Sequence, residues 1–167
     1  MDIRTKIGKR RTEIIHKSIA NTVISVDAFI EKEPLTIALS ELGWIRGFKG
    51  HNIDTNSIKY KDGDSQKHII KAQTTDKIIL FTSTGKFYTI ACDKIPGGKG
   101  FGDPIRLILE LAESEEILDI EINEEGSKFL VASSKGKGFI VDAADVLAQT
   151  KGGKQVLTVG EKEKALK

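Results

Sequence analysis

Short basic stretches rich in glycine recur along the sequence, and their composition suits the binding of phosphate. They are residues 46–51, 94–102 and 149–154. Glycine allows a backbone to approach a phosphate closely, and neighbouring lysines supply the opposite charge. One such stretch is usually a solvated turn. Three of them at equivalent places in successive repeats predict a basic rim that contacts phosphates.

The cations expected on this rim lie in or beside the glycine stretches and the hairpin turns described below. None of these segments resembles an element that reads base edges, so binding should tolerate any nucleotide sequence. The predicted contact residues are Arg46, Lys49, Lys86, Lys94, Lys99, Lys135, Lys137, Lys151 and Lys154.

Residues that could support catalysis or hold a metal are scattered. No histidine lies at metal-ligand spacing from Cys92, the single cysteine. The chain has neither a GxxxxGK[ST] phosphate loop nor a GxSxG elbow. Tyr60 and Tyr88 lack the neighbouring arginine expected beside a DNA-cleaving tyrosine. We therefore expect no catalytic residue, no metal ligand, no cofactor and no small-molecule substrate.

The charge is unevenly distributed along the chain. Lys and Arg number 26 and Asp and Glu 24, for a net charge of +2. Residues 107–127 hold eight acids and no base, so the remainder has 26 bases against 16 acids. Such segregation favours a polyanionic partner, although charge alone fits a lysine-rich solubility surface equally well. The clustered acids are Glu110, Glu113, Glu115, Glu116, Asp119, Glu121, Glu124 and Glu125.

The compartment is indicated by features that the sequence lacks. There is no apolar run of 18 residues, and the first residues lack the apolar core of a signal peptide. A single cysteine excludes an internal disulfide and fits a reducing compartment. We expect a cytoplasmic protein without a membrane partner.

Three segments, 36–45, 79–88 and 130–139, share one pattern: an apolar strand, a polar turn that ends in glycine, and a second strand that begins near an aromatic residue. The turn glycines Gly43, Gly85 and Gly136 are 42 and 51 residues apart. A tight hairpin usually requires a residue at positive φ, which glycine supplies. The pattern predicts repeated hairpins, with Trp44, Phe87 and Phe139 at comparable places.

A further strand-like stretch precedes each hairpin, at residues 22–26, 68–72 and 117–122. The repeating unit is therefore a small antiparallel sheet of three or four strands, spaced like a propeller blade. The predicted class is all-β, with about three blades at 21–60, 61–105 and 106–159. We expect 1–20 to be a basic, possibly helical linker and 160–167 to be a charged tail without strand pattern. Residues 143–148 should form a short helix capped by Asp142.

The residues themselves resemble a known family. Segments 33–46, 50–54 and 60–64 are similar to the first blade of the C-terminal domain found in the A subunit of bacterial topoisomerase IV. Segments 83–88, 130–134 and 147–157 are similar to later parts of that domain, and 10–14 to the link that precedes it. The resemblance covers nearly the whole chain, and the match around Gly43 and Trp44 is the most specific.

This resemblance implies a β-pinwheel, a propeller-like array whose basic rim binds and bends duplex DNA. It implies a domain that helps select DNA crossings for ATP-dependent strand passage in the bacterial cytoplasm, near the nucleoid. Its partners would be the catalytic core of the A subunit, and the ATPase-bearing B subunit. ATP and magnesium would serve other domains of the full enzyme. Segment 95–100 resembles only the glycine-lysine end of the gyrase basic box and lacks its leading Gln-Arg-Arg, which favours topoisomerase IV.

Two alternatives stay open from the sequence. The family domain has more blades than the three predicted here, so we expect either a cut sequence or a split or shortened gene. The second alternative is a propeller-like protein-interaction module with no role on DNA, in which the acidic stretch 110–125 would contact a basic partner.

Overall fold

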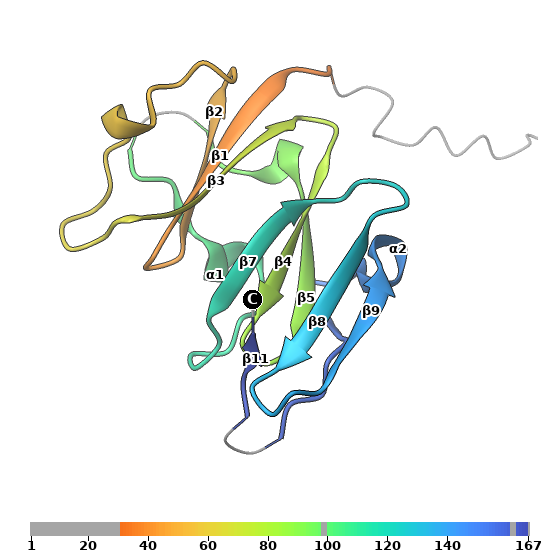
Figure 1. Ribbon diagram of the computed structural model, residues 1–167. Helices are drawn as coiled ribbons and strands as arrows, with labels where there is room; N and C mark the ends of the chain where they lie inside the picture. The colour runs from red at the N-terminus through yellow and green to blue at the C-terminus, as the bar shows by residue number, and fades with distance from the viewer. Residues whose placement is uncertain (1–30, 98–99, 161–162, 167) are drawn as a thin grey trace, which may run out of the picture.

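Three antiparallel sheets lie side by side in the computed structural model, which describes residues 31–97, 100–160 and 163–166 (Figure 1). The first sheet, here called blade 1, is built on the hairpin of β1 (Pro34–Ser40) and β2 (Trp44–Lys49). Strand β3 (Gln66–Gln73) pairs with β1, and the short β6 (Asp103–Pro104) pairs with β2. The predicted all-β class and the number of sheets are confirmed.

Blades 2 and 3 repeat this plan. The hairpin of blade 2 is β4–β5, with β7 beside β4 and β10 beside β5. The hairpin of blade 3 is β8–β9, with β11 beside β8. The bounds are β4 Lys77–Thr82, β5 Lys86–Ala91, β7 Ile117–Ile122, β8 Lys128–Ser133, β9 Gly138–Asp142, β10 Lys154–Gln155 and β11 Ala165–Leu166.

The chain passes back and forth between neighbouring blades. After completing the hairpin of blade 2 it returns to blade 1 with β6, and after the hairpin of blade 3 it returns to blade 2 with β10 (Figure 1). Each sheet therefore combines strands from one predicted blade range with strands from the range that follows it, the tail 160–167 being the last of these. The expected tail 160–167 contains β11, which pairs with β8, so the prediction that it lacks strand structure is wrong at Ala165–Leu166.

Helices are limited to single turns among the described residues: the 3-10 turns η3 (Thr55–Ser57) and η4 (Cys92–Lys94), α1 (Ile105–Ile108) and α2 (Ala143–Val146). The helix predicted after Asp142 is present but shorter than expected. The Asp142 side chain makes no capping hydrogen bond, so that part of the prediction is wrong. The expected linker 1–20 and the strand-like stretch 22–26 lie outside the described residues.

The repeated hairpin turns are confirmed in detail. Gly43, Gly85 and Gly136 have φ of 80°, 79° and 78°. Each glycine donates its backbone N–H to the carbonyl three residues earlier, at 3.1, 2.9 and 2.9 Å respectively. Because this conformation is strained for residues with a Cβ, the spacing of glycines located the turns correctly.

The aromatic residues after the turns are not equivalent, and that prediction is wrong. Leu39 faces Ile45 in blade 1, and Phe81 faces Phe87 at the same position of blade 2. Phe87 occupies this matched position of the second strand. Relative to the same position in the other blades, Trp44 lies one residue earlier and Phe139 one residue later. Because side chains alternate between the faces of a sheet, each shift by one residue reverses the face. Phe87 is 2% exposed, whereas Phe139 is 43% exposed.

Strand β4 is buried on both faces because it lies between neighbouring blades. Ile78 and Leu80 belong to the hydrophobic core shared with blade 1, whereas Ile79 and Phe81 belong to the core shared with blade 3. A strand covered on both sides reads as a continuous apolar run rather than an alternation. Sheet-to-sheet packing therefore explains the sequence of this strand.

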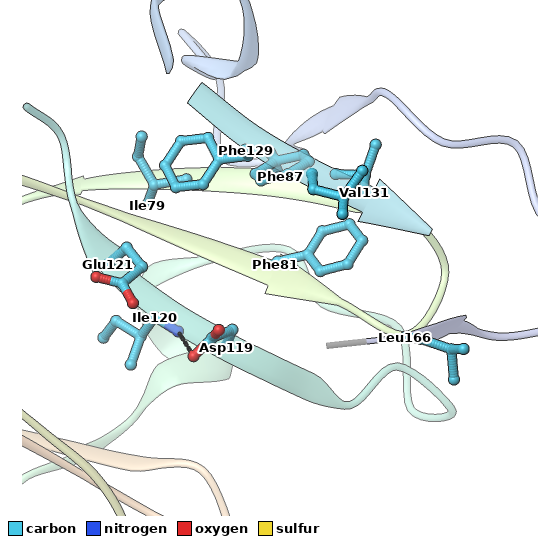
Figure 2. A pocket seen from close by; sticks show the side chains of 10 residues that line it. Ile79, Phe81, Phe87, Asp119, Ile120, Glu121, Phe129, Val131 and Leu166 are labelled. Atoms are coloured by element: carbon cyan, nitrogen blue, oxygen red, sulfur yellow. Dashed lines mark hydrogen bonds between the residues drawn. The ribbon is translucent and has the colours of Figure 1, made fainter. Parts of the chain in front are cut away.

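Aromatic packing joins blades 2 and 3, as Figure 2 shows. The ring centroids of Phe81 and Phe87 are 4.6 Å apart, and those of Phe87 and Phe129 are 6.0 Å apart. A hollow of about 70 Å³ lies beside these rings, with Asp119 and Glu121 on one side. Its mainly apolar lining makes it part of the packing between blades.

Candidate nucleic-acid interface

The glycine-rich connectors that follow the hairpins of blades 2 and 3 reach equivalent places. Each ends at a glycine with positive φ, Gly102 at 88° and Gly153 at 74°. A Cβ at Gly102 would lie 2.2 Å from the carbonyl oxygen of Ile45, and one at Gly153 would lie 2.9 Å from that of Phe87. These glycines therefore allow the connector to pack closely on the second strand of the preceding hairpin.

The third expected connector, 46–51, is different. Its first four residues form the end of β2, and Gly47 is buried inside the sheet. Only Gly50 and His51 follow the strand. The interpretation of this stretch as a loop equivalent to the other two is therefore wrong, because strand pairing with β1 extends through Lys49.

A hollow of about 490 Å³ opens where the connector crosses blade 1. Two cations, Arg46 from β2 and Lys59 from the loop after η3, line it together with Phe48 and Phe101. The Arg46 guanidinium lies 4.3 Å from the centroid of the Phe48 ring and donates from Nη1 to the carbonyl oxygen of Gly100. This cation–π contact and hydrogen bond hold the guanidinium in place.

The second hollow, of about 270 Å³, lies on blade 2 and brings together two of the predicted contact residues. Lys94 comes from η4 and Lys151 from the connector that follows blade 3, and both side chains are exposed. The floor includes Ile90 of β5 and the buried Leu109. Lys94 and Lys151 are 57 residues apart in the sequence. They line one hollow because the connector that follows the hairpin of blade 3 returns to blade 2.

The two hollows occupy equivalent positions in their blades. Phe48 and Ile90 each lie three residues after the matched pair Ile45 and Phe87, and Gly100 and Lys151 each lie two residues before the connector glycine. The buried aliphatic residues Ile58 and Leu109 are the third matched pair. Among the described residues that line the two hollows, none is acidic. We call them hollow 1 and hollow 2.

The other predicted cations lie elsewhere. Lys135 and Lys137 are exposed in the β8–β9 turn, and Lys86 is half-buried in β5. Lys49 forms an ion pair of 2.9 Å with Glu33, whose hydrogen bond and charge raise the pKa of the lysine. Lys154 donates from Nζ to the carbonyl oxygen of Asp145. Lys99 lies outside the described residues.

Lys59 was missed from the sequence because it lies in a lysine-rich loop without a glycine motif. A signal was nonetheless available, since Lys59 directly follows Ile58, an isolated apolar residue that proves to be buried. Lys61, two residues later, lies 4.5 Å from the centroid of the Trp44 ring.

Glu115 belongs to the acidic stretch 110–125, which in the alternative interpretation would contact a basic partner, but its side chain is buried. It is only 3% exposed, and its carboxylate accepts hydrogen bonds from Thr82, Thr84 and Tyr88 at 2.6, 2.5 and 3.1 Å. Burial by itself raises the pKa of this carboxyl, but the hydroxyl donors and the Ala112 N–H lower it below the ordinary value. Glu115 is therefore an ionised structural residue.

The described residues offer little for metal or thiol chemistry. Among them, no group of three or more His, Cys, Asp or Glu side chains is placed to hold a metal ion. Cys92 is buried, and burial, followed by the charges of Asp76 and Asp93, raises the pKa of its thiol to about 12. The thiol is therefore protonated at neutral pH. No helix within the described ranges has the length and apolar character needed to cross a membrane.

The side-by-side antiparallel sheets define a propeller-like, all-β repeat protein with basic hollows along its connectors. The chain belongs to the family described as DNA gyrase C-terminal domain, beta-propeller, whose model matches residues 76–123 and 127–166, more than half of the chain.

Curated relatives, each named as the A subunit of DNA topoisomerase 4, cover nearly all of the chain. The protein from Rickettsia bellii is 46% identical over 157 residues, which is 94% of this chain and 21% of that protein. The protein from Escherichia coli is 32% identical over 152 residues, or 91% of this chain and 20% of its own length. The chain thus spans about a fifth of the length of these relatives, and they support the expected resemblance.

Solved structures agree with the fold. The ParC C-terminal domain of E. coli superposes with a TM-score of 0.75 at 34% identity, covering 80% of this chain and 54% of that chain. A crystal structure titled as the C-terminal domain of DNA topoisomerase IV gives a TM-score of 0.69 at 16% identity, covering 83% of this chain and 46% of that one. The second likeness concerns the fold alone.

Proposed function

We propose that this chain binds duplex DNA without sequence specificity, as the C-terminal part of the A subunit of a bacterial topoisomerase IV. The observation that carries the proposal is the pair of equivalent hollows, each lined by two cations. A phosphate group placed in either hollow would meet two positive charges and the backbone of a connector, which is the chemistry that phosphate contacts require. The relatives' name supports DNA as the polyanion.

The repetition of the hollows suggests how DNA would be bent. Blades 1 and 2 lie side by side, so hollow 1 and hollow 2 would contact phosphate groups at two separate places along one duplex. A duplex that follows contacts on adjacent, mutually rotated sheets must curve, and the added contacts would offset the cost of bending. In the full enzyme, such a bent segment would help select the crossing that is captured for strand passage.

Partners and chemistry follow from the same proposal. The remainder of the A subunit, together with the ATPase-bearing B subunit, would supply DNA cleavage, ATP hydrolysis and magnesium, in the bacterial cytoplasm. The predicted cations outside the hollows, at 49, 86, 99, 135, 137 and 154, would add phosphate contacts along the rim. About five neutralised phosphates would give a slope of log K against log salt near −4.5.

The first test is the double variant Lys94→Ala/Lys151→Ala, which empties hollow 2 of charge. Counterion release predicts that the slope of log K against log salt becomes shallower by about 1.8, with a similar loss of affinity for every duplex sequence. Fluorescence anisotropy with plain duplexes across a salt series measures both quantities.

The matched control is Lys71→Ala/Lys77→Ala, which removes the same charge from exposed positions outside both hollows. It should change the slope by much less. Equal slopes for both double variants and the unchanged protein would contradict the hollow as a contact site. Absence of binding even at low salt would favour the alternative, a protein-interaction module that uses the acidic stretch 110–125.

A second prediction concerns activity. The isolated chain should neither cleave nor relax supercoiled DNA, with or without ATP and magnesium, because its sequence has no phosphate loop and no arginine-tyrosine pair. Gel electrophoresis of a supercoiled plasmid is the measurement. Relaxation that co-purifies with the chain through successive columns would overturn the expectation.

A further inference from the structure

A carboxylate closes the hairpin turn of every blade. Asp64 accepts hydrogen bonds from the backbone N–H groups of Leu42 and Ser65 at 3.0 and 2.8 Å. Glu115 accepts from the hydroxyls of blade 2, as described above, and Glu163 accepts from the Ser133 hydroxyl. Each carboxylate comes from the segment that leads into the strand beside the hairpin. We call these three residues the latch carboxylates.

Backbone hydrogen bonds show that the three latches are equivalent. In each blade the second residue of the turn donates its N–H to the carbonyl of the residue after the latch carboxylate. The bonds are Glu41 to Ser65 at 2.9 Å, Ser83 to Glu116 at 2.8 Å and Ser134 to Lys164 at 2.8 Å. The latch is therefore a repeated feature of the fold, although the three segments differ in sequence.

Each latch carboxylate is also linked to the position of a hollow. Six residues before it lies a buried aliphatic side chain: Ile58 before Asp64, Leu109 before Glu115 and Leu157 before Glu163. In blades 1 and 2 this side chain lines the hollow. The latch and the hollow are thus the two ends of one short segment.

In blade 2 a chain of hydrogen bonds runs from the latch to the hollow. The buried Tyr88 hydroxyl has one hydrogen, which it donates to Glu115 Oε2 at 3.1 Å and, as the weaker part of a shared hydrogen bond, to the carbonyl oxygen of Glu110 at 3.4 Å. The N–H of Glu110 donates to the carbonyl oxygen of Lys151 at 3.0 Å. The Tyr88 ring also supports the connector, because a Cβ at Gly153 would lie 2.8 Å from it.

We infer that Glu115 and Tyr88 are positioning residues for Lys151, and that they act on DNA binding through this lysine without touching DNA. The inference rests on the proposed function. The latch fixes the phenol, the phenol fixes residue 110, and residue 110 fixes the backbone from which the Lys151 side chain enters hollow 2. The expected effect is therefore on the geometry of one phosphate contact.

The test is a double-mutant cycle between Tyr88→Phe and Lys151→Ala, measured as DNA affinity and salt slope. Tyr88→Phe removes the hydroxyl and keeps the ring beneath Gly153. Lys151→Ala should weaken binding and make the slope shallower by about 0.9. Tyr88→Phe should weaken binding roughly twofold or more, the size expected for coupled neighbours, and should have no further effect once Lys151 is replaced.

Tyr60→Phe is the matched control, because Tyr60 is the other of the two tyrosines and its buried hydroxyl has no hydrogen-bond partner among the described residues. It should leave affinity and slope unchanged. Glu115→Gln is the second variant: it alters the same acceptor while keeping its shape, and should act in the same direction as Tyr88→Phe. Circular dichroism confirms that each variant is folded.

The outcomes separate the two proposals. If Lys151→Ala leaves affinity and slope unchanged, the contact assigned to hollow 2 is wrong. If Lys151→Ala weakens binding but Tyr88→Phe does not, the positioning role is wrong and the proposed function stands. An effect of Tyr88→Phe that persists in the Lys151→Ala background would also overturn the positioning role, because it would not act through this lysine.

Discussion

Replacing Gly85 by alanine should lower the midpoint of thermal unfolding by about 10 °C, a large effect for a single substitution. Gly85 ends the β4–β5 turn with φ of 79°, and its added Cβ would lie 2.0 Å from the carbonyl oxygen of Leu157. Since the Gly85 carbonyl accepts the N–H groups of both Val156 and Leu157, the neighbouring backbone cannot move away freely. Leu157 would be displaced from the core between blades 2 and 3.

Gly136→Ala separates the two causes of this loss. Gly136 occupies the same turn position with φ of 78°, but nothing lies within 4 Å of its Cβ position. Gly136→Ala should therefore introduce only the strain of the backbone conformation. The free energy of unfolding should fall by about 1 kcal/mol and the midpoint of thermal unfolding by roughly 3 °C. Calorimetry of both variants is the measurement. Equal losses would show that conformational strain alone accounts for Gly85.

The second large effect is expected for Glu115→Ala. This change leaves the Thr82 and Tyr88 hydroxyls and the Ala112 N–H, all donors to a buried carboxylate, without their acceptor. The loss of several hydrogen bonds to a charged group predicts a decrease of about 3 kcal/mol in the free energy of unfolding at pH 7. Glu116→Ala, at the exposed neighbouring position, should change stability by less than about 0.5 kcal/mol.

The loss of stability in Glu115→Ala should depend on pH, because the carboxyl of Glu115 has a lowered pKa in the native protein. An unfolded glutamic acid titrates near about pH 4.3, so the stabilisation is fully present above about pH 5 and is lost as pH falls through the lower native pKa. The difference in the free energy of unfolding between the unchanged protein and Glu115→Ala should therefore become smaller from pH 7 to pH 3. Urea unfolding at several pH values measures it, and a constant difference would exclude the ionised form as its source.

The parts of the fold predicted from the sequence are those governed by local rules. A positive φ requires glycine within a few residues of the strands it joins, so Gly43, Gly85 and Gly136 located the hairpins. The short strands β6 and β10 could not be found in the same way. Each has two residues, too few to show an alternation, and each pairs with a strand more than 50 residues away.

For the candidate site, the sequence indicates basic residues on glycine-rich connectors but does not indicate which of them lie close together in the fold. Lys94 and Lys151 are two of the nine cations predicted for the rim; the structure places both at hollow 2, and their contact with phosphate stays a prediction. Lys59 is absent from the predicted set because hollow 1, which it lines together with Arg46 and Phe101, is formed by three separate segments of the chain. The structural role of Glu115 could not be predicted, because the hydroxyls that stabilise its charge lie 27 to 33 residues earlier in the sequence.

The passing of the chain between sheets determines which piece of sequence could be gained or lost as a unit during evolution. Removing 61–105 would strip blade 1 of β3 and β6 and leave β7 and β10 without the hairpin they join. Removing 64–114, the 51 residues from one latch carboxylate to the next, would instead place Glu115 beneath the turn at Ser40 and β7 beside β1. Duplication of such an array is therefore expected to begin and end at its latch carboxylates, within the segments that join the blades.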